Sequence, residues 1–500
     1  MDIFAGILQG FQTTLQPWNF FYCFVGVFIG TLIGVLPGIG PVGTMAILLP
    51  VTYNISPVSA VILLAGIYYG ASYGCSTTSI LVNIPGEVVS VVTCLDGYQM
   101  AKQGRAGPAL GISAFGSLIG GTFATIVLMF LVIPLADIAV KFGPVEYFSL
   151  ICMSLTLMVF MVSGSFAKGI ISILIGLILS TVGLDKVRGF PRFTFGLPSL
   201  VDGVGLVNVA MGLFGITEIL YNLELNTKVV YKTRIKNLLP NLQDWKRSAK
   251  PIVRGSLIGF ICGTLPAAST ISTFLSYSIE KRFSKHPEEF GHGAIEGVAG
   301  PETANNAAAG GAFVPLLAFG IPPNAIMGLL LGALMIHNVT PGPLMLTQHP
   351  EIFWGVIASM YIGNVMLLLL NLPLIGLWVK LLQVPYSILA PLILLCCLMG
   401  AYSVGNNTAD ITIMVIFGIV GFFMRRGGYE LAPMILALLL GPIIETAFRQ
   451  SLSMSGGSFF IFFEKPISAV ALVVTALLVI SSGFSTYRKA KIKLPQDGEM

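Results

Sequence analysis

Long apolar runs recur from one end of this 500-residue chain to the other. Clear examples are residues 18–36, 110–134, 146–163, 168–184, 205–220, 352–378, 386–402, 408–424, 429–447 and 466–484. Each run is close to the ~20 residues that a helix needs to cross a hydrocarbon core of ~30 Å. Because lipid offers no partner to open backbone groups, these runs predict transmembrane helices.

The composition excludes a soluble chain of this length. Hydrophobic residues make up 55% of the chain and charged residues only 10%, whereas roughly a quarter of the residues in soluble domains are charged. A soluble chain of this size would divide into several domains, each with a charged surface. We therefore predict an all-α polytopic membrane protein with about 11–13 transmembrane segments.

The basic residues predict how the chain is oriented. Lys and Arg are absent from the first 101 residues, so we expect no cleavable signal and an N-terminus outside the cytoplasm. Segment 228–254 and the C-terminal tail are both rich in Lys and Arg, which favours the cytoplasmic side. A lipid or partner role for 228–254 stays open beside this topological one. Nucleic-acid binding is not predicted from the net charge of +5, because the basic residues lie mostly in short loops and the tail.

The chain contains an internal repeat. Residues 26–44 and 255–273 share six identical positions at an offset of 229, among them three Gly and one Pro. Residues 70–87 resemble 307–324 at an offset of 237, and 133–141 resemble 372–380 at an offset of 239. The predicted organisation is a first transmembrane repeat over 1–225, a basic cytoplasmic linker over 226–254, a second repeat over 255–485 and a cytoplasmic tail over 486–500.

Loop charges predict that the two repeats have opposite orientations in the membrane. Loop 101–109 contains Lys102 and Arg105, whereas its counterpart 338–351 contains neither residue type. Loop 185–204 disagrees, because it is basic although it is expected outside. Inverted repeats with broken helices are typical of secondary transporters, whose sites lie near the membrane midplane where the repeats meet. Helix N-termini there attract anions, and freed carbonyls can hold a cation.

Two Gly- and Pro-rich segments predict re-entrant hairpins. Segment 34–41 packs three Gly and two Pro into eight residues, which a continuous helix does not tolerate. Segment 263–270 repeats the motif. The alternative is a surface turn, with the upstream glycines forming a helix-packing face. A hairpin tip and a glycine packing face can both be present. The candidate binding residues at the two tips are Gly38, Gly40, Thr44, Ser269 and Thr270.

Hydroxyl and amide side chains follow each hairpin. In the first half, Ser76, Thr77 and Thr78 precede a break that contains Asn83 and Pro85. These hydroxyls can bind carboxylate oxygens or Na⁺, or they can bond to their own helix backbone. The matching residues of the second half are Asn305, Asn306, Gly310, Gly311, Pro322 and Asn324.

Few acids are expected deep in the membrane. Glu302 either takes part in the site or lies at the membrane interface. Asp410 and Glu445 are the candidate intramembrane acids, because such acids are often functional. The seven Cys residues show neither metal-ligand spacing nor a disulfide framework. A metal site therefore stays undefined, apart from a Na⁺ near the hairpin tips.

Several long motifs resemble one family. They are GVLPGIG (34–40), IYYGASYGCSTTSILVNIPGE (67–87), LDGYQMAKQGRAGPALGI (95–112), the stretch from LSYSIEK to AFVPLL (275–317) and HNVTPGPLM (337–345). Together they resemble the large permease subunit of tripartite tricarboxylate transporters, over about residues 15–485.

The resemblance implies a permease of the bacterial inner membrane. It also implies two partners, a small membrane subunit of about four helices and a periplasmic solute-binding protein. The substrates implied are citrate and other carboxylates, and the coupling ion is typically Na⁺, with no other cofactor. Ala267 and Ser269 stand where the family has Gly, and Pro323 replaces the Gly of its Ile-Pro-Gly break. These departures leave the identity of the carboxylate open.

Two other functions compete with this one. Gly70–Gly74 matches the G-x-S-x-G pattern of an intramembrane serine protease, but the four His residues lie mostly in loops, where none is placed to act as the base. We therefore do not expect an enzyme. A stand-alone transporter or channel for small anions, with no binding protein, fits the same fold.

Overall fold

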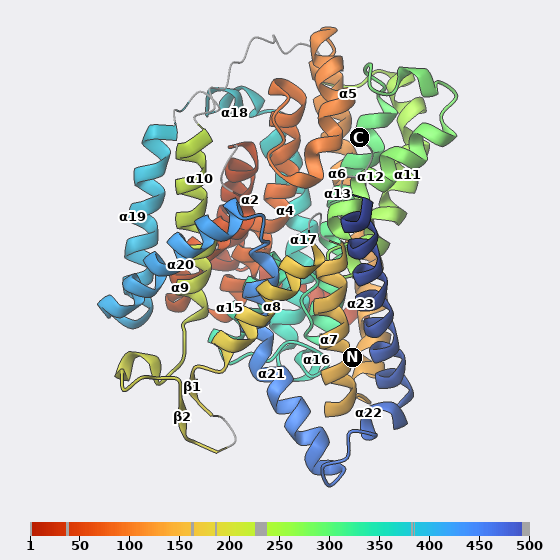
Figure 1. The fold of residues 1–500 in the computed structure, drawn as a ribbon. Helices are drawn as coiled ribbons and strands as arrows, with labels where there is room; N and C mark the ends of the chain where they lie inside the picture. The colour runs from red at the N-terminus through yellow and green to blue at the C-terminus, as the bar shows by residue number, and fades with distance from the viewer. Residues whose placement is uncertain are drawn as a thin grey trace, which may run out of the picture. The chain divides into compact units, whose positions relative to one another are not determined.

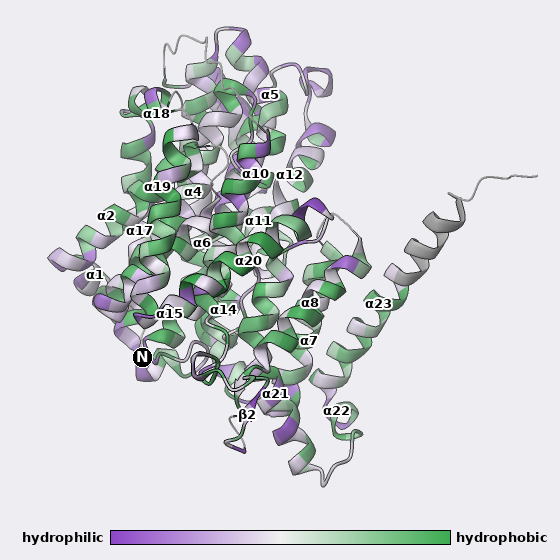
Figure 2. Cartoon of the chain, turned by 60° about the vertical axis from the view of Figure 1, so that its left-hand side comes forward, coloured by the Kyte–Doolittle hydropathy of each residue, from purple (hydrophilic) through white to green (hydrophobic). Residues whose placement is uncertain are grey.

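A computed structural model of the protein describes residues 3–36, 40–161, 165–185, 188–225, 238–381, 384 and 386–492. Helices dominate these segments (Figure 1). Nine of the described helices are long and apolar enough to cross a membrane, and three shorter apolar helices join them. Hydrophobic residues follow the long helices in Figure 2, and many hydrophilic residues lie near helix ends. The prediction of an all-α polytopic membrane protein is confirmed.

The contacts divide the chain into two compact units, which we describe separately. The first unit comprises residues 1–140 and 207–422, and the second comprises residues 141–206 and 423–500. The sequence repeats follow other boundaries, and those boundaries stay a prediction. The α-helices of the first unit are α1 (Ile3–Thr14), α2 (Pro17–Val35), α3 (Pro41–Leu48), α4 (Pro57–Val82), α5 (Val91–Lys102), α6 (Ala106–Ala139), α9 (Leu206–Ala210), α10 (Thr217–Leu225), α11 (Leu242–Thr264), α12 (Ser269–Phe283), α13 (Glu296–Gly311), α14 (Phe313–Phe319), α15 (Ala325–Ile336), α16 (Met345–Gln348), α17 (Pro350–Asn371), α18 (Ile375–Leu381), α19 (Tyr386–Gly405) and α20 (Thr408–Arg426). A π-helical segment, Met211–Ile216, joins α9 to α10, and together they form one of the nine span-length helices.

Small residues let two pairs of helices in the first unit approach closely. On α2, Gly30 faces α4, and a Cβ there would lie 2.5 Å from the Ile67 carbonyl oxygen. On α11, Gly259 faces α13, and a Cβ there would lie 2.7 Å from the Ala304 Cα. Gly26 and Gly34 on α2, and Gly255 and Gly263 on α11, make the same kind of contact one turn away. Such spacing of small residues is typical of tightly packed membrane helices.

The two helix pairs follow the offsets of the sequence repeat. Gly30 and Gly259 differ by 229 positions, and their partners Ile67 and Ala304 differ by 237. The breaks that follow also correspond. Asn83 ends α4 with φ 58°, and Gly320 ends α14 with φ 69°, both in the left-handed region, which suits Gly and Asn at a helix C-terminus. The same packing and the same helix end therefore occur twice along the chain.

Within its described residues the second unit contains five α-helices and a short antiparallel strand pair, besides a 3-10 turn at Pro198–Leu200. These elements are α7 (Pro144–Met161), α8 (Phe166–Ser180), β1 (Gly183–Leu184), β2 (Pro191–Arg192), α21 (Ala432–Met454), α22 (Ile461–Glu464) and α23 (Pro466–Ile492). Gly176 lets α8 approach the backbone of α21 at Met434. The Ser149 and Ser468 hydroxyls, 2.6 Å apart, join α7 to α23.

A ring of alternating charges holds the strand pair to α21. Arg192 makes two hydrogen bonds to Glu445, of 2.6 and 3.0 Å. Arg449 lies 2.6 Å from Glu445 and 3.0 Å from Asp185, and Asp185 lies 3.4 Å from Arg192. Glu445 and Asp185 thus pair with Arg192 and Arg449, which gives Arg192 a structural role in loop 185–204. Glu445, a candidate functional acid, has a structural role here.

We expect the Arg192–Glu445 pair to stabilise the second unit cooperatively. Glu445→Ala would leave two guanidinium groups without their shared carboxylate. Because Glu445 is about a quarter exposed, we expect a loss of about 2 kcal/mol, below the ~3–5 kcal/mol of a fully buried broken pair. Thermal unfolding of Arg192→Ala, Glu445→Ala and the double variant measures their coupling. Strictly additive effects would contradict this role.

Candidate functional site

A buried carboxyl group, Glu302, lies at the centre of the first unit. It projects from α13, whose sixteen residues are all buried. Helix α13 packs against α6, α11 and α12 (Figure 1) and also touches α4 and α5. Glu302 is 1% exposed, so its carboxyl group depends on hydrogen bonds from these neighbouring helices.

Three hydroxyl groups from three different helices donate to the Glu302 carboxylate. Ser76 of α4 donates to Oε2, and Thr93 of α5 donates to Oε1. Ser113 of α6 adds a longer bond of 3.3 Å to Oε2. All three hydroxyl residues are buried. The carboxylate therefore links α13, from the second half of the chain, to three helices of the first half.

Two amide side chains extend this polar cluster along α13. Asn306 donates to the Ser117 hydroxyl of α6 at 2.7 Å and back to the Glu302 carbonyl at 3.2 Å. Asn305 donates to the Ser72 carbonyl of α4 at 3.0 Å. The structure thus brings together three predicted site residues, Ser76, Asn305 and Asn306. We call them, with Glu302, Thr93, Ser113 and Ser117, the polar centre.

Three other hydroxyls of α4, those of Ser72, Thr78 and Ser79, bond to their own helix backbone. Thr78 donates to the Cys75 carbonyl at 3.0 Å, and Ser79 does the same. Such bonds satisfy a hydroxyl within its own helix. Thr77 is buried on the same helix. Ser72, the serine of the G-x-S-x-G pattern, donates to the Tyr68 carbonyl at 3.1 Å.

The first hairpin is described only in part. Gly38 lies outside the described residues. Gly40 precedes α3, and its carbonyl accepts a hydrogen bond of 3.1 Å from the Thr44 hydroxyl. A Cβ at Gly40 would meet nothing within 4 Å, so this glycine borders open space and no contact demands it.

The second hairpin is anchored by its backbone. Ala267 has φ 57° and donates its backbone N–H to the Pro323 carbonyl at 2.9 Å. Pro322 beside it is buried. Ser269 begins α12, and its carbonyl accepts the Ser272 hydroxyl, while Thr270 is exposed. The tip therefore touches the break at 320–324, and none of the hydrogen bonds described for this tip reaches Glu302.

The remaining predicted residues shape helix contacts and helix ends. Gly311 leaves room for the α11 backbone at Phe260, and Gly310 for Ala124 of α6. Asn324 begins α15, accepts the Met327 N–H and donates to the Tyr68 hydroxyl at 3.3 Å. Asn83 ends α4, and Pro85 follows it in an exposed position. The intramembrane candidate Asp410 accepts a hydrogen bond of 2.7 Å from Asn208.

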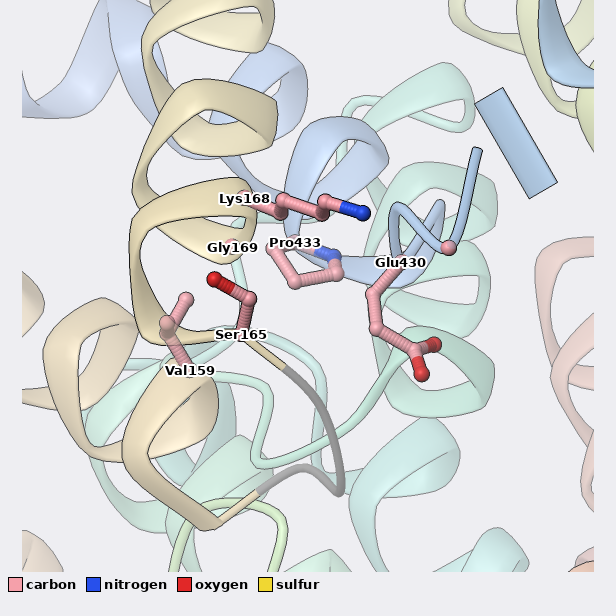
Figure 3. Close-up of a pocket in the computed structure, with 7 residues that line it drawn as sticks. Val159, Ser165, Lys168, Gly169, Glu430 and Pro433 are labelled. Atoms are coloured by element: carbon pink, nitrogen blue, oxygen red, sulfur yellow. The ribbon is translucent and has the colours of Figure 1, made fainter. Parts of the chain in front are cut away.

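Two hollows lie outside the polar centre. The one in Figure 3 belongs to the second unit, is bordered by Lys168 and Glu430, and has a volume of about 10 Å³. That is room for one water molecule at most. An open groove of about 600 Å³ in the first unit is lined by polar residues such as Asn19 and Ser59, and by Glu351. Its volume would admit a small carboxylate, but none of the described residues that line it is a Lys or Arg.

Comparison with known proteins gives a consistent family. The model of the tripartite tricarboxylate transporter TctA family matches residues 20–436. An uncharacterized 52.8 kDa protein from the TAR-I ttuC′ 3′ region of Agrobacterium vitis is 47% identical over 99% of both chains. An uncharacterized protein from the TAR-II ttuC′ 3′ region of the same organism is 48% identical over 45% of this chain and 92% of its own length. No solved structure matches.

Proposed function

Because the chain belongs to the tripartite tricarboxylate transporter TctA family, we propose that it is the large permease subunit of a binding-protein-dependent system for carboxylate uptake. The observation that carries this proposal is the polar centre. Hydroxyl, amide and carboxyl groups from both halves of the chain meet there, buried between α4, α5, α6 and α13. Polar groups buried at membrane depth are characteristic of transport pathways.

The proposed mechanism is alternating access between two inverted repeats in the bacterial inner membrane. A periplasmic binding protein delivers the carboxylate, and a small membrane subunit completes the permease. The Asn amides and backbone N–H groups of the broken segments bind the anion. A coupled cation, Na⁺ in this proposal, offsets the charge of the substrate. The hydroxyls of the first half and the amides of the second half would face the same substrate from the two repeats.

Uptake into proteoliposomes tests the proposal. The permease is reconstituted with its small subunit, and uptake of labelled citrate is followed under an inward Na⁺ gradient, with and without the binding protein. Uptake that requires both Na⁺ and the binding protein supports the tripartite function. Uptake without the binding protein supports a stand-alone transporter. If a panel of tri-, di- and monocarboxylates gives no uptake under any condition, carboxylate transport is rejected.

Two serines one helical turn apart on α4 give a matched test of the polar centre. Ser76 donates to Glu302, whereas Ser79 donates to its own helix backbone. We expect Ser76→Ala to reduce initial uptake about 10-fold or more, because a hydrogen bond to a charged group contributes about 1.5–3 kcal/mol. Ser79→Ala should stay within about twofold of the wild type. Equal losses in both variants would place the polar centre outside the transport pathway.

The amides of α13 allow a second test by uptake. Asn306→Ala removes the bond to Ser117 and leaves a cavity beside Glu302. We expect a loss of uptake larger than that of Ser76→Ala, because both a donor and the packing of α13 against α6 are removed. Normal uptake by Asn306→Ala, with full surface expression, would contradict this role.

A further inference from the structure

Several buried acids of the described segments form ion pairs, and Glu302 does not. Asp96 is also buried without an ion pair, but three fixed backbone N–H groups donate to its carboxylate, whereas hydroxyls that can rotate surround Glu302. Asp244, Glu280 and Glu296 each face an arginine, at Arg105, Arg254 and Arg247 respectively. Among the described residues, no ion pair involves Glu302, and its side-chain partners are the three hydroxyls. Buried charges are normally paired with a charge or bound to a metal, so Glu302 lacks the usual counter-charge.

The surrounding atoms form a set of oxygen ligands. The two carboxylate oxygens of Glu302 lie together with the hydroxyl oxygens of Ser76, Thr93 and Ser113. A hydroxyl has two lone pairs and a hydrogen that rotates, so each can turn from donating to the carboxylate to accepting a cation. Hard cations prefer oxygen ligands of this kind. Cys75 offers its sulfur to Asn305 instead.

The charge of the set selects a monovalent ion. One carboxylate supplies one negative charge, and the other ligands are neutral. Divalent ions in proteins usually take more than one carboxylate, or a carboxylate together with substrate phosphates. A monovalent hard cation neutralises Glu302 without leaving a net charge in the helix bundle.

We propose that Glu302, Ser76, Thr93 and Ser113 bind a Na⁺ ion between the two halves of the chain. This inference rests on the proposed transport function and specifies where its coupling ion lies. The ion joins α13 to α4, α5 and α6, so its binding stabilises their contact. It also removes a negative charge near Asn305 and Asn306, which favours approach of a carboxylate. By linkage, bound carboxylate strengthens Na⁺ binding by the same factor.

Thermal unfolding of the purified permease tests the site without substrate or partner proteins. The midpoint is measured in NaCl, KCl and choline chloride at one ionic strength and one pH. We expect it to rise with the logarithm of the Na⁺ concentration, by about a few degrees near 100 mM, because an ion that binds the folded state stabilises it. Glu302→Gln should abolish the rise, and Glu464→Gln, at an exposed residue of α22, should keep it.

A second variant keeps the test possible if the first does not fold. If Glu302→Gln gives no folded protein, Ser113→Ala removes the most distant of the three ligands and should shift the Na⁺ dependence to about tenfold higher concentration. Identical midpoints in all three salts, or a Na⁺ response that survives Glu302→Gln, overturns the site. A midpoint that follows pH but not Na⁺ also overturns it, in favour of a proton on Glu302. Failed uptake with an intact Na⁺ response would instead reject only the carboxylate function.

Discussion

Asp96→Ala is expected to leave little folded permease in the membrane. Asp96 is 0% exposed, and one of its oxygens accepts the backbone N–H groups of Gly291, Gly293 and Ala294 at 2.8–2.9 Å. Its other oxygen accepts the Tyr277 hydroxyl at 2.9 Å. Alanine would leave these four donors without their acceptor. Gly293 and Ala294 are buried, and Gly291 and Tyr277 are partly buried. Each buried orphan costs about 1–3 kcal/mol, so the loss is a large part of the stability of a typical domain.

The position of Asp96 explains why the loss would reach the polar centre. The three N–H groups lie just before α13, which carries Glu302, Asn305 and Asn306. Asp96 itself lies on α5, three residues after Thr93. The carboxylate therefore fixes where α13 begins relative to α5. Without it, the start of α13 loses its attachment to the first half of the chain.

Detergent extraction followed by size-exclusion chromatography measures this loss. Asp96→Asn keeps one oxygen for the N–H groups, so we expect a partial yield between that of the wild type and that of Asp96→Ala. Asp137→Asn on α6 is the control, because Asp137 is exposed. A wild-type yield of Asp96→Ala, with unchanged unfolding temperature, would show that the three N–H groups find other acceptors.

The helical membrane fold was predictable because its signals are local. Runs of apolar residues determine the spans, and the glycines of 26–34 predicted a packing face that the structure places against α4. Their counterparts in 255–263 pack against α13 in the same way. The repeat was also visible in the sequence, at offsets of 229 and 237, because the residues that pack two helices together recur in both halves. The direction in which the second repeat crosses the membrane stays a prediction.

The polar centre was predictable only in part, because burial of a polar side chain depends on distant helices. Ser76 and Thr78 have similar hydroxyls two positions apart, yet only Ser76 faces Glu302, since neighbouring positions on a helix point in different directions. Thr93, Ser113 and Ser117 were missed for the same reason. The sequence left open whether Glu302 takes part in the site or lies at the membrane interface. The Gly-Gly and Ala-rich sequence after it was the available signal that other helices pack closely around α13.

Gly259→Leu is expected to prevent folding, and even Gly259→Ala to destabilise the protein severely. The added Cβ would overlap the Ala304 backbone, 2.7 Å from its Cα. Backbone atoms of a helix cannot rotate aside as a flexible side chain can, so α11 must move away from α13. Overpacking of this kind costs about 1–3 kcal/mol or more. Unfolding temperature and extraction yield measure the effect.

Substitutions at two further glycines test whether the destabilisation by Gly259→Ala comes from close helix packing or from the loss of any helical glycine. Gly376 lies inside α18 and has nothing within 4 Å of an added Cβ, so Gly376→Ala should be neutral or stabilise by about 0.5–1 kcal/mol. Gly30 is the counterpart of Gly259 in the first half, and its added Cβ would lie 2.5 Å from the Ile67 carbonyl oxygen. Gly30→Ala should therefore resemble Gly259→Ala and differ from Gly376→Ala. If Gly30→Ala were harmless while Gly259→Ala unfolded the protein, the α2–α4 and α11–α13 pairs would share the glycine spacing in sequence but not the close backbone contact.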